Sequence, residues 1–287
     1  MSKKPFDFLV TDKEPLVYIE KTMVRMNDGF LTLLRGEQGK EVLAPASHLV
    51  MMLGAGTSIS QEAAIFCALN DLHVSFARGG TNIHSMFMSG RYQSPESVMN
   101  QASLIAEHKF KVAKLLMRYR LERHGCPLDI IEDMLSTKDL VSLGAWEGRY
   151  AIAEYKKFAL KSKVTFTRDF DGKDSINEKL NVLNNALYSV CTAICLSCGL
   201  HPSLGFIHGY TRRGGFAFDL ADIFKKETTL PLAFDPKTIG AKAAMYRLSH
   251  KLKDHNSEII KQMVKLCLLL GTGTYAQLED YFANPGC

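Results

Sequence analysis

The feature that most constrains this fold is a change in hydrophobic period near residue 90. Before it, short apolar or alternating runs are separated by turn residues, a pattern typical of β-strands. These runs cover residues 16–26, 30–35, 48–53, 72–77 and 83–88. The "NDG" at 27–29 predicts a hairpin, because Gly29 can take a positive φ. One helix interrupts the strands at 58–70, where Ser58 and Gln61 have capping-box spacing.

After Gly90 the apolar residues recur every three or four positions, which predicts helices. Residues 95–124 have the pattern of a long amphipathic helix with one solvated face. Ser175 and Glu178 form a second capping-box pattern, and Gly199 is a predicted C′ residue. Further helices are expected over about 127–135, 138–161 and 174–199. We therefore predict an α+β protein, with a small β-rich N-terminal domain at 1–92 and a larger all-α domain at 93–287.

Composition points to a soluble, globular protein. The 287 residues are 46% hydrophobic and 23% charged. The sequence has no run of about 18 apolar residues, so we expect no transmembrane helix. The start "MSKKPFDFLV" lacks a signal-peptide pattern, and seven scattered cysteines fit reduced thiols, so we expect a cytoplasmic location. The net charge of +5 is compatible with a polyanion partner, as are the clusters "RYRLER" at 118–123 and Arg212–Arg213. The charge alone does not establish that the partner is a nucleic acid.

One stretch, "GFIHGYTRRGGFAFDLADIFKK" at 205–226, collects groups that could perform chemistry. Asp219 and Asp222 are three residues apart and so share one face of a helix. His208 lies in a turn beside glycine, where its side chain can project from a fixed backbone. Imidazole with carboxylates could hold Mn²⁺ or Mg²⁺ and leave positions open for phosphate oxygens. A solvated acidic pair neutralised by lysines, with a backbone-bonded histidine, is the open alternative.

A metal ion at this place needs a further ligand from another element, and Glu147 in "SLGAWEGRYAIAEYKK" is the best candidate. Gly144 and Gly148 flank it at helical spacing and would let a substrate or another backbone approach. By spacing alone, an ordinary exposed helix glutamate is the more common interpretation.

The predicted helix over 174–199 has a polar stripe inside its apolar pattern, which must be hydrogen-bonded in a bundle. It could be a structural network, the interpretation we favour for the asparagines, or an outer shell around a site. The stripe consists of Asn181, Asn184, Asn185 and Tyr188. Three cysteines on the same helix, Cys191, Cys195 and Cys198, favour core packing over a metal site. "GAGTS" at 54–58 lacks the phosphate-loop lysine and is interpreted as a turn into a helix.

These residues resemble a known family. "GLHPSLGFIHGYTRRGGFAFDLADIFK" is similar to the G-x-x-P-x-[IL]-G-F-[IL]-H … F-x-x-D-[IL]-A-D signature of the CRISPR-associated integrase of spacer acquisition. The resemblance extends through "WEGRYA", "DSINEKLNVLNNALYSV" and "LGAGTSISQEA", covers most of residues 16–230, and is greatest for the subtype I-E branch.

The resemblance implies a β-rich dimerisation domain and a helical catalytic domain. It implies metal ligands at Glu147, His208 and Asp222, with Asp219 as the neighbouring catalytic acid and Mg²⁺ or Mn²⁺ as the cofactor. Implied DNA-binding residues are Arg212, Arg213, Lys225, Lys226 and, more weakly, Tyr188. The implied reaction is transesterification, in which the 3′-hydroxyl of a short DNA duplex attacks a phosphodiester at a repeat boundary. Implied partners are double-stranded DNA, a second copy of the chain and a small ferredoxin-like protein.

Two departures from the family pattern concern the handling of DNA ends. An aromatic residue that braces the DNA end is replaced here by Lys21, and Ser58 stands where relatives often carry a basic residue. Two other functions stay open at this point: a stand-alone metal-dependent nuclease acting on branched DNA, and a non-catalytic DNA-binding scaffold with a decayed site.

Overall fold

The structure is a computed structural model that describes residues 10–36, 39–44, 47–78, 82–85, 95–172, 174–209, 214–254 and 258–283. After a 3₁₀ turn at Val10–Asp12, the strands are β1 (Glu14–Ile19), β2 (Met23–Asn27), β3 (Phe30–Leu34), β4 (Lys40–Leu43), β5 (His48–Leu53), β6 (Ser58–Ile59), β7 (His73–Arg78) and β8 (Asn82–Ser85). The helices are α1 (Gln61–Leu69), α2 (Pro95–Arg123), α3 (Leu128–Leu135), α4 (Leu140–Lys161), α5 (Ser175–Ser197), α6 (Gly215–Phe224), α7 (Thr229–Phe234), α8 (Gly240–Lys253), α9 (Ile259–Thr272) and α10 (Tyr275–Ala283).

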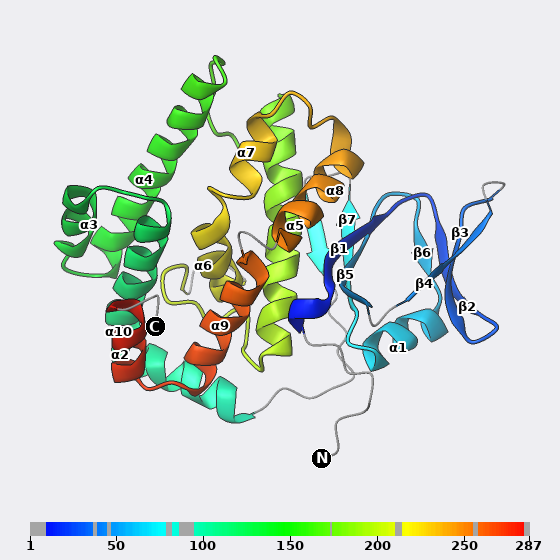
Figure 1. The fold of residues 1–287 in the computed structure, drawn as a ribbon, viewed down its shortest axis with the longest axis horizontal. Coiled ribbons are helices and arrows are strands. Elements are labelled where there is room, and N and C mark those ends of the chain that lie inside the picture. Colours follow the sequence, from blue (N-terminus) through cyan, green and yellow to red (C-terminus); the bar gives the residue numbers. More distant parts are fainter. Residues whose placement is uncertain are drawn as a thin grey trace.

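The described strands form two four-stranded sheets at one end of the molecule (Figure 1). One sheet has the order β1-β5-β7-β8, with β1, β5 and β7 parallel and β8 antiparallel to β7. The other has the order β4-β3-β2-β6, in which the β2–β3–β4 meander is antiparallel. Asp28 and Gly29 both have positive φ at the β2–β3 turn, which confirms the predicted hairpin.

The first sheet is buried on both faces, so it joins the two parts of the molecule. On β5, Met51 and Leu53 pack into a small core with the second sheet and α1. Leu49 and Met52 belong instead to the large core of the helical part, which reaches the sheet through α5 and α8. This explains why residues 48–53 are almost uninterruptedly apolar, as expected of an interior parallel strand.

Helix α5 is the central element of the helical part and packs against α6, α7, α8, α9 and β5 (Figure 1). Among the described helices it is the one long and apolar enough by composition to cross a membrane, yet 72% of that window is buried inside the fold. It is a core helix. Cys191 and Cys195 are fully buried in its apolar face, as predicted for core packing.

The α+β class is confirmed, and the sequence-based boundaries differ from the structure mainly at caps and short strands. The cap of α1 is Ser60 rather than Ser58, which lies in β6, and the cap of α5 is Asp174 rather than Ser175. The run at 16–26 is two strands, separated at Lys21, whose φ is +49°. Strands β4 and β6 were not predicted. The predicted boundary at 92/93, and residues 86–88 of a predicted strand, lie outside the described residues.

His73 on β7 makes stability depend on pH. It is 3% exposed and bonds Ser197 of α5, and burial, followed by the charge of Lys13, lowers its pKa from 6.5 to about 4. The unfolded chain therefore takes up a proton before the folded protein does. We expect the contribution of His73 to the unfolding free energy to fall by about 3 kcal/mol as pH decreases from about 6.5 to 4. Urea unfolding across this range, with His73→Gln as the comparison, measures it; an equal pH slope in both proteins contradicts it.

Candidate active site

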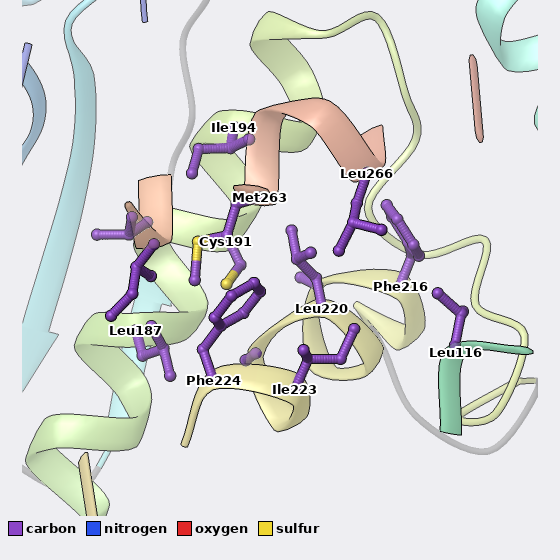
Figure 2. Close-up of a cluster of buried hydrophobic side chains, with 14 of the residues drawn as sticks. Leu116, Leu187, Cys191, Ile194, Phe216, Leu220, Ile223, Phe224, Met263 and Leu266 are labelled. Carbon is purple, nitrogen blue, oxygen red and sulfur yellow. The ribbon is translucent and has the colours of Figure 1, made fainter. Parts of the chain in front are cut away.

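Helix α6 is held in place by its apolar face, and that fixes the direction of its acidic residues. Figure 2 shows Leu220, Ile223 and Phe224 pointing into the core formed with α5 and α9. The chain before α6 folds back against it closely: a Cβ on Gly215 would lie 2.1 Å from the His208 carbonyl oxygen, and one on Gly205 would lie 2.6 Å from the Gly215 carbonyl carbon. Only glycine allows this approach, which places His208 beside the helix.

Asp219 anchors the segment that carries His208. Its carboxylate is 1% exposed and accepts three backbone N–H bonds, from Phe206 at 2.6 Å, Ile207 at 3.0 Å and His208 at 2.9 Å. It also accepts a bond from His208 Nδ1 at 2.8 Å. Because a carboxylate only accepts, Nδ1 carries a hydrogen, and in its neutral form the imidazole presents the lone pair of Nε2 to the other side. Asp219 is therefore a positioning residue for His208.

Asp222 lies where several charges meet, and it is 7% exposed. Its Oδ2 is 3.7 Å from His208 Nε2 and 4.0 Å from Arg120 Nη1, and its Oδ1 pairs with Lys225 Nζ. Burial alone would raise the pKa of Asp222, but Lys225, Arg120 and His208 lower it to about 2. For His208, burial works against the charged form, yet the Asp219 bond and nearby carboxylates raise its pKa overall.

Glu147 reaches the same place from α4. Its Oε1 accepts a bond from Arg120 Nη1 at 2.9 Å, and this nitrogen is also the one that faces Asp222. The side chains of Arg120 and Glu147 are 7% and 14% exposed. The three predicted ligands thus come together from three separate parts of the chain: α4, the segment at 206–209 and α6.

These groups line a cavity of about 550 Å³. The polar stripe of α5 forms one wall and has both of the roles considered from the sequence. Asn181 bonds Phe170 and Arg168, and Asn184 accepts a bond from Thr229, so they hold the 166–172 segment and α7. Asn181, Asn184, Asn185 and Tyr188 also face the cavity.

The predicted DNA-binding residues are arranged around the same cavity. Lys225 is held between Asp222 and the Tyr188 hydroxyl, 2.6 Å away, and is 15% exposed. Lys226 is 27% exposed and contacts the His124 carbonyl oxygen at 2.8 Å and Glu154 Oε2 at 3.3 Å. Burial raises the pKa of Tyr188. Arg212 and Arg213 lie outside the described residues.

The alternative of a solvated acidic pair is wrong, because both aspartates are buried and bonded. Arg120 was missed as a site residue, although "RYRLER" marked its cluster as basic. His124 was missed too: its Nε2 donates to the Ile223 carbonyl oxygen at 3.0 Å and the Tyr150 hydroxyl donates to its Nδ1 at 2.9 Å. Burial and then Arg120 lower the pKa of His124 to about 3, so it braces α6 as a neutral ring. No local sequence signal identifies that role.

The donor types fit a divalent ion of intermediate hardness: two carboxylates, and an imidazole whose free nitrogen has its tautomer fixed by Asp219. Within the described residues, however, no three such side chains stand as a preassembled metal sphere. Arg120 and Lys225 instead engage Glu147 and Asp222 directly. The side chains therefore have the donor types that such an ion prefers and lie around one cavity, but Arg120 and Lys225 already pair with the two carboxylates.

The chain is similar to known proteins both in sequence and in fold. Residues 127–234, which include Glu147, His208 and Asp222, match the family model "CRISPR associated protein Cas1". A CRISPR-associated endonuclease Cas1 from Clostridium sp. (strain SY8519) is 29% identical over 79% of this chain and 74% of its own length. Among solved structures, TtCas1 in complex with DNA superposes with a TM-score of 0.70 at 23% identity, covering 90% of this chain and 92% of that chain. A casposase bound to an integration product superposes with a TM-score of 0.74 at 15% identity, covering 91% of each chain. The chain is thus similar in sequence to CRISPR-associated Cas1 proteins and shares the fold of their solved structures.

Proposed function

We propose that this protein is a metal-dependent DNA integrase and endonuclease that inserts new spacer DNA into a CRISPR array. The observation that carries the proposal is the convergence of Glu147, His208 and Asp222 on one cavity already lined with cations. Relatives named as endonucleases, one neighbour bound to DNA and one bound to an integration product support it.

In this proposal Mg²⁺ or Mn²⁺, held by Glu147, His208 and Asp222, would activate the attacking 3′-hydroxyl and stabilise charge on the phosphodiester under attack. The bond from the attacking 3′-oxygen to phosphorus forms as the bond from phosphorus to the 3′-oxygen of the target strand breaks, and the proton lost by the attacking hydroxyl is balanced by one taken up by that leaving oxygen. Asp219 keeps Nε2 of His208 directed at the site. The Tyr188 hydroxyl holds Lys225, and Glu154 holds Lys226, so both ammonium groups stay where a phosphate enters.

The proposed partners are double-stranded DNA, both as prespacer and as repeat, a second copy of the chain, and a small ferredoxin-like protein. The DNA-bound neighbours support the first, whereas the homodimer, the ferredoxin-like partner, the subtype I-E assignment and a cytoplasmic location are predictions from the sequence resemblance. Lys21 lies between β1 and β2, and Ser58 lies in β6, next to the 54–57 turn. Lys21 N donates to Ala55 O, and Ser58 N donates to Thr22 O, both at 3.0 Å. We expect DNA ends to be handled there without an aromatic brace.

A strand-joining assay tests the proposal. The protein, its partner protein and Mn²⁺ or Mg²⁺ are incubated with a labelled duplex bearing 3′-hydroxyls and a supercoiled plasmid that contains a repeat. We expect the label to become covalently attached to relaxed plasmid, and a duplex with 3′-deoxy ends to give no product. Plasmid cleavage without joining would indicate the stand-alone nuclease instead. Joining that persists in excess chelator would contradict the metal dependence.

A further inference from the structure

We propose that Arg120 and Lys225 are built-in counter-cations of the metal-free site, and that divalent ion and DNA phosphate therefore bind it cooperatively. The inference rests on the proposed function, because it takes Glu147, His208 and Asp222 as the ligands. It goes beyond that function because it names Arg120 and Lys225 as the cations that must move when the ion binds. It also names the DNA phosphate as the anion that restores the charge balance.

The contacts are direct and buried. One nitrogen of Arg120 lies 2.9 Å from Glu147 Oε1 and 4.0 Å from Asp222 Oδ2, so it stands between two of the side chains that would hold the ion. Lys225 pairs with the other oxygen of Asp222. The Arg120, Asp222 and Lys225 side chains are 7%, 9% and 15% exposed, so water screens these charges little.

The charges of the site are nearly balanced without an ion. Glu147 and Asp222 carry two negative charges, and Arg120 and Lys225 carry two positive ones. Glu154 and Lys226 also line the cavity, and Glu154 pairs with both Lys226 and Lys157. The charge of Asp219 is directed to three backbone N–H groups and to His208. Carboxylates that already form ion pairs therefore bind a further cation more weakly than unpaired carboxylates do.

A divalent ion entering this site brings two positive charges close to two fixed ones. Arginine cannot lose its proton in a protein, so Arg120 cannot relieve the repulsion by titrating. Two other routes remain: the guanidinium can swing away from the carboxylates, or an anion can enter with the ion. A DNA phosphodiester is the anion that the proposed reaction supplies. Its oxygens would accept hydrogen bonds from Arg120 or Lys225 and would also be available to the ion.

Cooperativity of this kind is reciprocal. If phosphate raises the affinity for the ion, the ion raises the affinity for DNA by the same factor. We expect Mn²⁺ to bind weakly to the DNA-free protein and at least about tenfold more tightly when DNA is present. A factor of this size is typical of coupled binding sites. Removing one counter-cation should tighten Mn²⁺ binding to the DNA-free protein by about tenfold and shrink the effect of DNA.

The experiment is a Mn²⁺ titration of the full-length protein, followed by the electron paramagnetic resonance of free Mn²⁺. It is done with and without a duplex whose 3′ ends are deoxy, so that no reaction occurs. The variants are Arg120→Gln and Lys225→Gln, which approach Asp222 from different sides. Arg118→Gln is the matched control, because Arg118 lies on the same helix but pairs with Glu122. Thermal unfolding of each variant, with and without Mn²⁺, shows whether it is folded and whether the ion stabilises it.

Tighter DNA-free binding in either folded cation variant, with Arg118→Gln unchanged, supports the inference. Unchanged or weaker binding in the folded variants overturns it, while the proposed metal site stands if Glu147→Gln and Asp222→Asn lose Mn²⁺. Mn²⁺ binding that is unaffected by those two ligand variants defeats the proposed site itself, and the inference with it. Equal Mn²⁺ affinity of the wild-type protein with and without the duplex also overturns the inference.

Discussion

Asp222→Asn is expected to reduce strand joining by more than about a hundredfold. Losing even an outer partner of a metal ligand typically costs 10- to 100-fold, and Asp222 is a proposed ligand itself. The asparagine cannot bring a negative charge to the ion, and it leaves Lys225 and Arg120 with one carboxylate fewer. The rate of joining per folded protein, measured with the labelled 3′-hydroxyl duplex, is the readout.

Asp222→Asn also leaves a buried lysine without its partner, which by itself destabilises a protein by about 3–5 kcal/mol. The double variant Asp222→Asn/Lys225→Met separates the two effects. We expect it to recover much of the unfolding free energy and none of the joining activity. Asp235→Asn is the matched control, since Asp235 pairs with Arg247 outside the cavity. Recovery of joining in the double variant would mean that Asp222 serves only to neutralise Lys225.

Hydrophobic period was sufficient to predict α2, α3, α4 and α5, because each buries an apolar stripe, whereas α7 to α10 were expected only as part of an all-α domain. The bounds expected for α2, α3 and α4 lie within two residues of those observed. The caps of α1 and α5 were misplaced because each helix start offers two capping residues, Ser58 and Ser60 at α1 and Asp174 and Ser175 at α5. Only backbone geometry selects Ser60 and Asp174. β4 and β6 are short edge strands whose polar residues give no alternating pattern, so pairing with neighbours decides them.

For the site, spacing alone could not decide whether Asp219 and Asp222 were buried. Their burial follows from the packing of Leu220, Ile223 and Phe224 into the core with α5 and α9 (Figure 2). This packing turns the other face of α6 towards Arg120 and the 206–209 segment. Glu147 is 61 positions from His208 in the sequence, so its flanking glycines made it no more than a candidate, and the family resemblance was needed to predict it as a ligand. The role of Arg120 depends on the approach of α2 to α4 and α6, which no local pattern encodes.

Asp219→Asn is expected to lower the unfolding free energy by about 3 kcal/mol. Each oxygen of Asp219 accepts two bonds: Oδ2 from the backbone of Phe206 and Ile207, Oδ1 from the backbone and ring of His208. In asparagine an NH₂ group replaces one of these oxygens. This hydrogen-bond donor then faces two N–H groups that are also donors. Hydrogen bonds to a buried charge contribute about 1.5–3 kcal/mol, and unsatisfied donors add to the loss. Urea unfolding at pH 7 measures the change.

If Asp219 positions His208, the same substitution should also weaken Mn²⁺ binding per folded protein by about 10- to 100-fold, because the imidazole tautomer is no longer fixed. A purely structural role would lower stability and leave this affinity unchanged. Asp139→Asn is the matched control: Asp139 caps α4 at an exposed position, where asparagine is as good a cap as aspartate. Unchanged stability and Mn²⁺ affinity in Asp219→Asn would contradict the anchor role, and the placement of His208 would then rest on the glycine packing between Gly205 and Gly215 alone.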